Sequence, residues 1–124
     1  MTLRNYLYNV LEAKETPEGV TYSISLNRES PIYQAHFPGM PVTPGVCIIQ
    51  MVEEMLADHT GKVLQIATVK NAKFLTMLEP GEEIVKVHLS NIRIEGESIK
   101  AHSTITDCSS TIIYAKLSVV CNEQ

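Results

Sequence analysis

Apolar and polar residues alternate strictly in several short stretches of the chain. Between residues 20 and 27 every even-numbered residue is apolar and every odd-numbered residue from 21 on is small and polar, a period of two that is typical of a strand with one buried face. The same alternation recurs over residues 63–70, 85–90, 99–105 and 113–119. Short turns containing Gly, Pro, Asp or Ser separate the later segments, and short turns favour antiparallel neighbours.

Two places in this pattern are less regular. Residues 6–14 fit the first arm of a hairpin that turns at residues 16–19, but the apolar spacing from Leu3 to Leu11 also fits a helix. At Asn91 the alternation slips by one position, because the next apolar residues continue on even numbers. Such a slip predicts a β-bulge or a strong local twist.

The middle of the chain differs in character. Residues 31–45 hold four of the six prolines and two of the six glycines, so we expect a long, stiff loop without regular structure. A helix over residues 44–60 is predicted next, with Thr43 as N-cap, Pro44 at its first position and Gly61 just beyond its end. Its surface is apolar around most of its circumference, which is typical of a buried helix. Its polar stripe consists of Gln50, Glu53, Glu54 and Asp58.

Composition sets the broad class. The chain has 124 residues, 44% hydrophobic and 19% charged, with a formal charge of -4, values that are ordinary for one folded domain, here 1–124. The expected order of elements is two strands, a loop, one buried helix and four strands. This order predicts an α+β architecture in which one curved sheet wraps around the helix. The chain contains no block of five Lys or Arg residues, which a nucleic-acid partner would require. The longest run of aliphatic or Cys residues, 46–49, is too short to span a membrane. Three cysteines without paired spacing argue against a disulfide framework and for the cytoplasm.

Two motifs resemble the bacterial 3-hydroxyacyl-acyl-carrier-protein dehydratases of fatty-acid synthesis. Residues 33–46 read YQAHFPGMPVTPGV, which is similar to that family's F-Q-G-H-F-P-G-x-P-V-x-P-G-V. Residues 71–74, NAKF, and 80–82, PGE, are similar to its N-A-R-F and P-G-D/E. The resemblance covers nearly the whole chain in element order and implies a hotdog fold. We expect no cofactor. A metal role for His88 and His102 would need further ligands at fixed spacing, so we expect both, on polar strand faces, to be surface residues.

The resemblance also implies a site. His36 would remove the α-proton of a 3-hydroxyacyl thioester, since a neutral imidazole is a usable base near neutral pH. Backbone N–H groups at the helix start, represented by Gly45, would hold the thioester oxygen as negative charge develops on it. The residues assigned to substrate contact on the same basis are Phe37, Pro44, Val46, Met51 and Phe74.

One position departs from the family pattern. The family carries a catalytic Glu or Asp fourteen residues after the His, and this chain has Gln50 there. A glutamine side chain has no titrating proton and cannot serve as the general acid. We hypothesise that Glu54, one turn further along the same helix face, supplies the missing carboxyl. The alternative is that the whole polar stripe is a solvated helix face.

Three functions remain open at this stage: a 3-hydroxyacyl thioester dehydratase, a thioesterase of the same fold, and a non-catalytic subunit that binds acyl chains or completes a heteromer. The resemblance implies a homodimer, with hexamers built from three dimers as a further assembly, and places Gln50 and Glu54 across the dimer interface from His36. The acyl group would arrive on acyl carrier protein or on coenzyme A. Carrier protein is acidic, and Lys70, Lys73 and Arg93 are the candidate contacts, although the family's basic pair after Phe74 is replaced by Leu75-Thr76.

Overall fold

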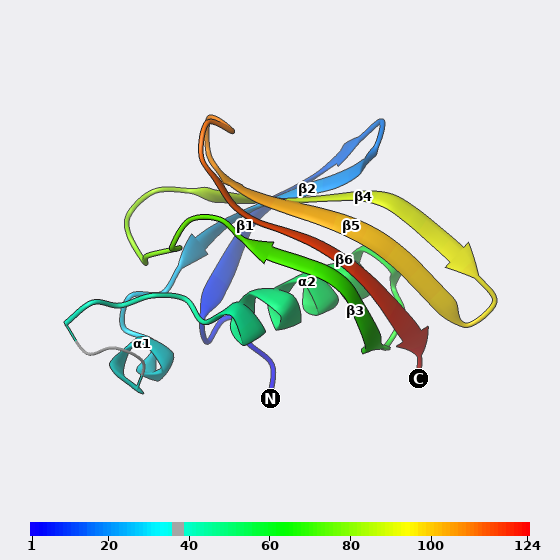
Figure 1. The fold of residues 1–124 in the computed structure, drawn as a ribbon, viewed down its shortest axis with the longest axis horizontal. Helices are drawn as coiled ribbons and strands as arrows, with labels where there is room; N and C mark the ends of the chain where they lie inside the picture. Colours follow the sequence, from blue (N-terminus) through cyan, green and yellow to red (C-terminus); the bar gives the residue numbers. More distant parts are fainter. Residues whose placement is uncertain (36–38) are drawn as a thin grey trace.

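Over residues 1–35 and 39–124, which the computed structural model describes, six strands form one antiparallel sheet (Figure 1). They are β1 (Tyr8–Thr16), β2 (Gly19–Leu26), β3 (Leu64–Phe74), β4 (Val85–Glu95), β5 (Ser98–Asp107) and β6 (Ile113–Glu123). Their order across the sheet is β1-β2-β4-β5-β6-β3. Strands β1 and β3 therefore form the two edges.

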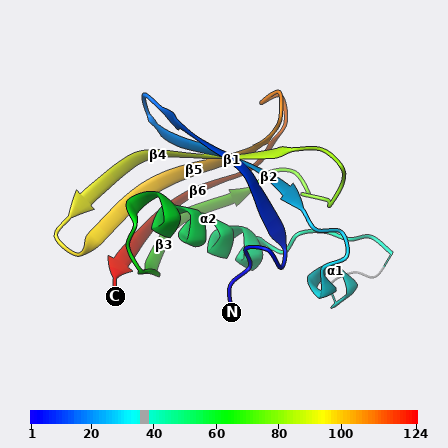
Figure 2. The same ribbon diagram turned by 180° about the vertical axis from the view of Figure 1, so that it is seen from behind.

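Helix α2 (Gly45–Thr60) lies against the inner face of the curved sheet, as Figures 1 and 2 show from opposite sides. The face of α2 that meets the sheet buries Ile48, Met51, Val52, Met55 and Leu56. The alternate residues of the central strands complete this core: Val87 and Leu89 from β4, Ile105 from β5, and Ala115 and Leu117 from β6. The strand alternation and the apolar helix thus produce the predicted α+β architecture.

Both irregular stretches of the sequence pattern are resolved by strand pairing. Residues 8–16 form a strand that pairs with β2, so the helical alternative for the first segment is wrong. The pairing of β4 with β5 shifts register between Ser90 and Arg93, and Asn91 has a φ of 50°. The predicted bulge is confirmed, because an extra residue with left-handed backbone absorbs the change of phase.

Two local predictions are wrong. The proline-rich stretch is not wholly irregular, because Pro31 begins a short helix, α1 (Pro31–Ala35), and proline suits a first helical position, where no N–H partner is needed. The residue before α2 is Pro44, with extended φ and ψ of -61° and 145° and no side-chain cap, so Thr43 is not the N-cap. At the other end Gly61 has a φ of 70° and donates its N–H to the carbonyl of Ala57, as predicted.

Neither helix of the described chain has the length and apolar character needed to cross a membrane. The three cysteines, Cys47, Cys108 and Cys121, are free thiols. Within residues 1–35 and 39–124, no three His, Cys, Asp or Glu side chains come close enough together to hold one metal ion.

Candidate functional site

A groove of about 400 Å³ opens at the N-terminal end of α2. One wall is the segment that leads into the helix, residues 42–45, together with Ile48 from its first turn. The other wall is the end of β3 at Phe74 and the residues that follow it, up to Leu78. Most of these side chains are apolar, so the groove suits a hydrophobic chain whose polar end meets the start of the helix.

The groove meets the first turn of α2 at Gly45 and Ile48, where the backbone N–H groups of the helix start lie. The carbonyl of Pro44 accepts the N–H groups of Cys47 and Ile48, at 3.0 and 3.1 Å. For the two preceding amides, Gly45 and Val46, the described residues provide no acceptor. Unpaired amides at a helix start present partial positive charge, and this arrangement stabilises an oxyanion.

Gly45 is also a close-packing position. A methyl group at its α-carbon would come within 2.9 Å of the ring of Phe74. The ring therefore rests directly on the first turn of α2, and it is itself half exposed, at 49%. The structure thus brings together three of the predicted residues, Pro44, Gly45 and Phe74, in one groove.

Thr43 holds this groove together rather than capping the helix. Its backbone N–H donates to the carbonyl of Leu78 on the opposite wall, at 2.8 Å. Its hydroxyl lies 2.8 Å from the hydroxyl of Tyr33 in α1, and both side chains are 3% exposed. Burial raises the pKa of Tyr33 to about 12, so its hydroxyl stays protonated. The sequence analysis missed Tyr33, whose partner is ten residues away across the proline-rich segment.

Gln50 and Glu54 do not line the groove. Their side chains contact the N-terminal segment and each other instead. One Glu54 oxygen accepts the N–H of Leu3 at 2.7 Å and the amide of Gln50 at 2.9 Å. The other accepts the N–H of Arg4 at 2.9 Å and the hydroxyl of Tyr8 at 2.8 Å. A carboxylate offers about four acceptor positions, so this one is saturated.

The remaining amide hydrogen of Gln50 points the same way, toward the carbonyl of Met1. Asp58 extends the network by accepting from the hydroxyl of Tyr22 at 2.6 Å and from Arg4 at 3.1 Å. The hydrogen bond from Tyr22 holds the pKa of Asp58 below its usual range.

None of the four residues of the polar stripe lines the groove of its own chain. The N-terminal segment contacts Gln50, Glu54 and Asp58, whereas Glu53 accepts the N–H of Ile66 in β3. Asp58 remains exposed to solvent, so only part of the stripe is covered.

The other predicted contacts fall into three groups. His36 and Phe37 lie outside the described residues. Met51 is 1% exposed and belongs to the core rather than to the groove, because it faces the sheet. Val46 is 71% exposed at the start of α2 and does not line the groove.

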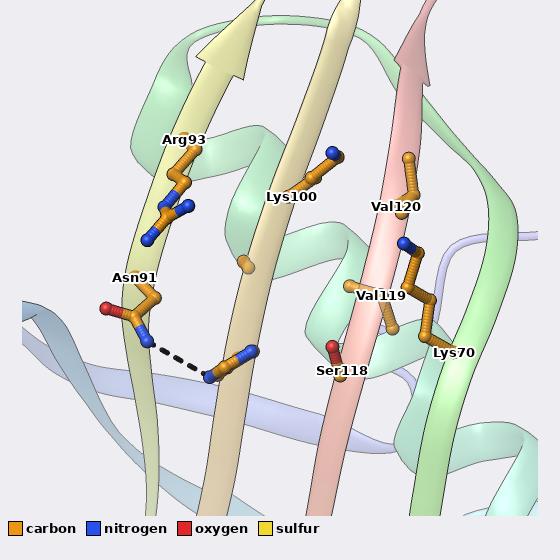
Figure 3. A pocket seen from close by; sticks show the side chains of 9 residues that line it. Lys70, Asn91, Arg93, Lys100, Ser118, Val119 and Val120 are labelled. Carbon is orange, nitrogen blue, oxygen red and sulfur yellow. Dashed lines mark hydrogen bonds between the residues drawn. The ribbon is translucent and has the colours of Figure 1, made fainter.

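A second, basic depression of about 300 Å³ lies on the outer face of the sheet, away from α2 (Figure 3). Lys70, Arg93 and Lys100 line it, on β3, β4 and β5. His102 also lines it and hydrogen-bonds to the side chain of Asn91 at 3.2 Å. Two of the predicted carrier contacts therefore share one surface, and His102 is exposed as expected.

His88 differs from the expectation. It is half-buried, with its two ring nitrogens 3.0 Å from the hydroxyl of Thr21 and 3.1 Å from that of Thr106. Desolvation by burial, helped by the charge of Lys86, lowers the pKa of this imidazole. Threonines on the two flanking strands enclose the ring, which the polar pattern of β4 alone does not indicate.

With this geometry in hand, comparisons with known proteins identify the family. The family model of the ApeI-like proteins, described as ApeI dehydratase, matches residues 12–111. The chain belongs to the ApeI-like dehydratase family. The recognition of a dehydratase-type hotdog protein from its motifs is thereby confirmed.

Curated relatives of this ApeI-like protein carry a related name. A 3-hydroxyacyl-acyl-carrier-protein dehydratase FabZ from Chloroflexus aggregans is 28% identical over 101 residues, covering 73% of this chain and 70% of the relative. The FabZ of Fusobacterium nucleatum is 27% identical over 106 residues, or 77% and 74% of the two chains. The FabZ of Caulobacter vibrioides is 36% identical over 84 residues, which are 60% of this chain and 48% of the relative.

Solved structures show the same fold. The dehydratase heterocomplex ApeI:P from Xenorhabdus doucetiae contains a chain that matches with a TM-score of 0.76 at 13% identity, covering 92% of this chain and 96% of that one. A hypothetical thioesterase from Streptococcus pneumoniae, solved with coenzyme A, matches with a TM-score of 0.67 at 7% identity, covering 94% and 85%. The hotdog fold predicted for this ApeI-like protein is thus confirmed.

Proposed function

We propose that this protein dehydrates 3-hydroxyacyl thioesters to 2-enoyl thioesters. The observation that carries the proposal is the apolar groove at the start of α2, where the first two amides of the helix, those of Gly45 and Val46, have no acceptor among the described residues. An acyl chain would lie along Phe74 and Met77, and the thioester oxygen would accept hydrogen bonds from the two amides.

In the proposed reaction His36 takes the α-proton. The electron pair of the broken C–H bond moves into the thioester, and the resulting enolate oxygen is stabilised by the helix amides. The enolate then re-forms the carbonyl, a carbon–carbon double bond forms, and the bond to the 3-hydroxyl breaks. The departing oxygen takes one proton and leaves as water, so that atoms and charge balance.

The position that supplies this proton in the family pattern is occupied by a different residue in this chain. Gln50 has no proton to give. The carboxylate of Glu54 accepts four hydrogen bonds within its own chain, and every copy in a homodimer would carry the same contacts. We therefore favour the imidazolium of His36 as the donor, since it holds the proton removed in the first step. The prediction that Glu54 is the acid remains the competing hypothesis.

The outer face of the sheet supports an acidic carrier protein as the bearer of the thioester. Arg93 and Lys100 are direct cross-strand partners on this face, and so are Lys73 and Lys116. Like charges placed directly opposite are destabilising, and an acidic partner would relieve both pairs. Glu95, 3.4 Å from Lys100, relieves the first pair only in part. Coenzyme A is the alternative carrier.

We further propose that the protein assembles as a homodimer through β3. This strand is a sheet edge of eleven residues, most of them exposed, and an unpaired edge is a template for pairing with another strand. Light scattering coupled to gel filtration would test this, with a monomer mass contradicting it. A mass of six chains would extend the assembly to three dimers.

Crotonyl thioesters of carrier protein and of coenzyme A give the direct test of function, because dehydration is reversible. We expect water to add to the double bond, with loss of enoyl absorbance and no free thiol. His36→Ala should abolish this conversion, whereas Tyr22→Phe, which alters a hydroxyl bonded to Asp58 and not to a groove residue, should not. Release of free thiol would indicate a thioesterase instead, and an absence of both reactions would indicate a non-catalytic subunit.

A further inference from the structure

The segment leading into α2 is held at two points, and both lie at residue 43. The backbone N–H of Thr43 is tied to the carbonyl of Leu78 across the groove, at 2.8 Å. Its hydroxyl is tied to the hydroxyl of Tyr33, also at 2.8 Å, in a site that is almost closed to solvent. Gly45, a groove residue whose amide has no acceptor in the described part of the chain, is only two residues further along.

Tyr33 itself is firmly anchored. Its ring is part of the hydrophobic core, and its backbone N–H donates to the carbonyl of Ser30 at 3.1 Å. Ser30 is fully buried and is in turn fixed by the carbonyl of Asn27, at 3.0 Å. The Tyr33 hydroxyl therefore links the Thr43 side chain to a firmly packed part of the hydrophobic core.

We propose that Tyr33 is a positioning residue, which acts through Thr43 to set the direction of the Gly45 and Val46 amides at the start of α2. The role rests on the proposed function, because those amides are its oxyanion donors. An oxyanion hole works only when its donors are already aimed at the charge that develops, without reorganisation during the reaction. A buried hydrogen bond two residues before the first donor provides such a constraint.

The same bond joins both ends of the segment that carries His36 in the sequence. Residues 33 and 43 are ten positions apart, so the bond ties α1 directly to the residue that precedes Pro44 and the start of α2. Tyr33→Phe would keep the ring in the core but leave the Thr43 hydroxyl buried without its partner.

Four variants test the proposal: Tyr33→Phe, Thr43→Val, Thr43→Ser and the double change Tyr33→Phe with Thr43→Val. We expect the first two to lower kcat by about 3- to 30-fold with little change in KM, since a misaimed donor weakens transition-state binding more than substrate binding. Thr43→Ser keeps the hydroxyl and should retain near-normal kcat. The double variant should be no worse than either single change, because one bond is lost in all three.

Tyr22→Phe is the matched control. Tyr22 is as deeply buried as Tyr33, and its hydroxyl donates to Asp58 at 2.6 Å, away from the groove. This variant loses a hydrogen bond and some stability but should keep its kcat. Equal losses of kcat in Tyr22→Phe and Tyr33→Phe would show a general effect of destabilisation and overturn the proposal, as would multiplying losses in the double variant.

A second readout does not depend on turnover. Amide chemical shifts of Gly45 and Val46 should move in Tyr33→Phe and in Thr43→Val, and should stay in place in Tyr22→Phe and Thr43→Ser. Unchanged shifts in all variants would overturn the positioning role. If the wild-type protein turns over no enoyl thioester, the proposed reaction fails, while these shifts still decide whether Tyr33 sets the amides.

Discussion

Replacing Glu54 by Gln separates a structural role for this carboxylate from a catalytic one. The carboxylate accepts four hydrogen bonds, from Leu3, Arg4, Tyr8 and Gln50. A glutamine keeps one acceptor oxygen and turns the other into a donor, so two of the four donors would face an N–H₂ group.

Hydrogen bonds to a charged group contribute about 1.5–3 kcal/mol each. Allowing for rearrangement of the exposed segment, we expect Glu54→Gln to cost about 2–4 kcal/mol. For a chain of this size that corresponds to a drop in Tm of roughly 8–15 °C, measured by calorimetry or circular dichroism. Loss of the N-terminal contacts should also speed amide exchange at residues 3 and 4.

Glu53→Gln is the matched control on the same helix. Glu53 accepts a single hydrogen bond, from the N–H of Ile66 at 2.7 Å, which an amide oxygen can accept equally well, so Tm should fall by less than about 4 °C. Equal Tm values for the two variants would refute the structural reasoning. Turnover, measured well below both Tm values, should persist in Glu54→Gln; a loss of about 10²–10⁴-fold would instead establish Glu54 as the acid.

Three further predictions concern the groove, the outer face and acid stability. In Gly45→Ala, the new methyl group would come within 2.9 Å of the Phe74 ring and should displace it. We expect this to raise KM for long acyl chains at least about threefold in steady-state assays. An unchanged KM would contradict this packing. Lys70→Glu combined with Arg93→Glu should lower kcat/KM about tenfold or more for carrier-bound substrate and leave coenzyme A substrate unaffected, whereas equal effects on both would exclude carrier docking there. The hydrogen bond from Tyr22 lowers the pKa of Asp58, so the ionised carboxylate stabilises the fold above its unfolded pKa of about 4, and this contribution is lost as pH falls through the lower pKa of the folded state. In urea titrations, Asp58→Asn should therefore make the free energy of unfolding less dependent on pH below about pH 4. An unchanged pH dependence in this variant would count against that role of Asp58.

The strands could be read from the sequence because each one has a single buried face. Alternation of period two is a local property, so the positions of β2, β4, β5 and β6 and the bulge at Asn91 follow from neighbouring residues alone. Helix α1 was missed for a related reason. Proline content suggests a loop, but Pro31 stands at the first helical position, where its missing N–H costs nothing.

Some residues of the candidate site could likewise be predicted from the local sequence, and others could not. Gly45 and Pro44 were predicted from a motif at a helix start, and the structure places them beside Phe74 in one groove. Tyr33 went unnoticed because its partner Thr43 had a plausible local use as a helix cap. Only the folded chain shows that Pro44 is the N-cap and that the Thr43 hydroxyl turns to Tyr33.

By itself, the amino-acid sequence determined the α+β hotdog architecture, the dehydratase-type family and the helix start on which the proposed chemistry depends, since all three are written in short-range patterns of side chains. The tertiary structure decided the partners of the polar stripe on α2. Glu54 meets the N-terminal segment across some fifty residues of sequence, and no local pattern encodes which distant backbone amides will reach a carboxylate. Hydrogen-bond partners brought together only by packing are set by the geometry of the whole sheet and helix.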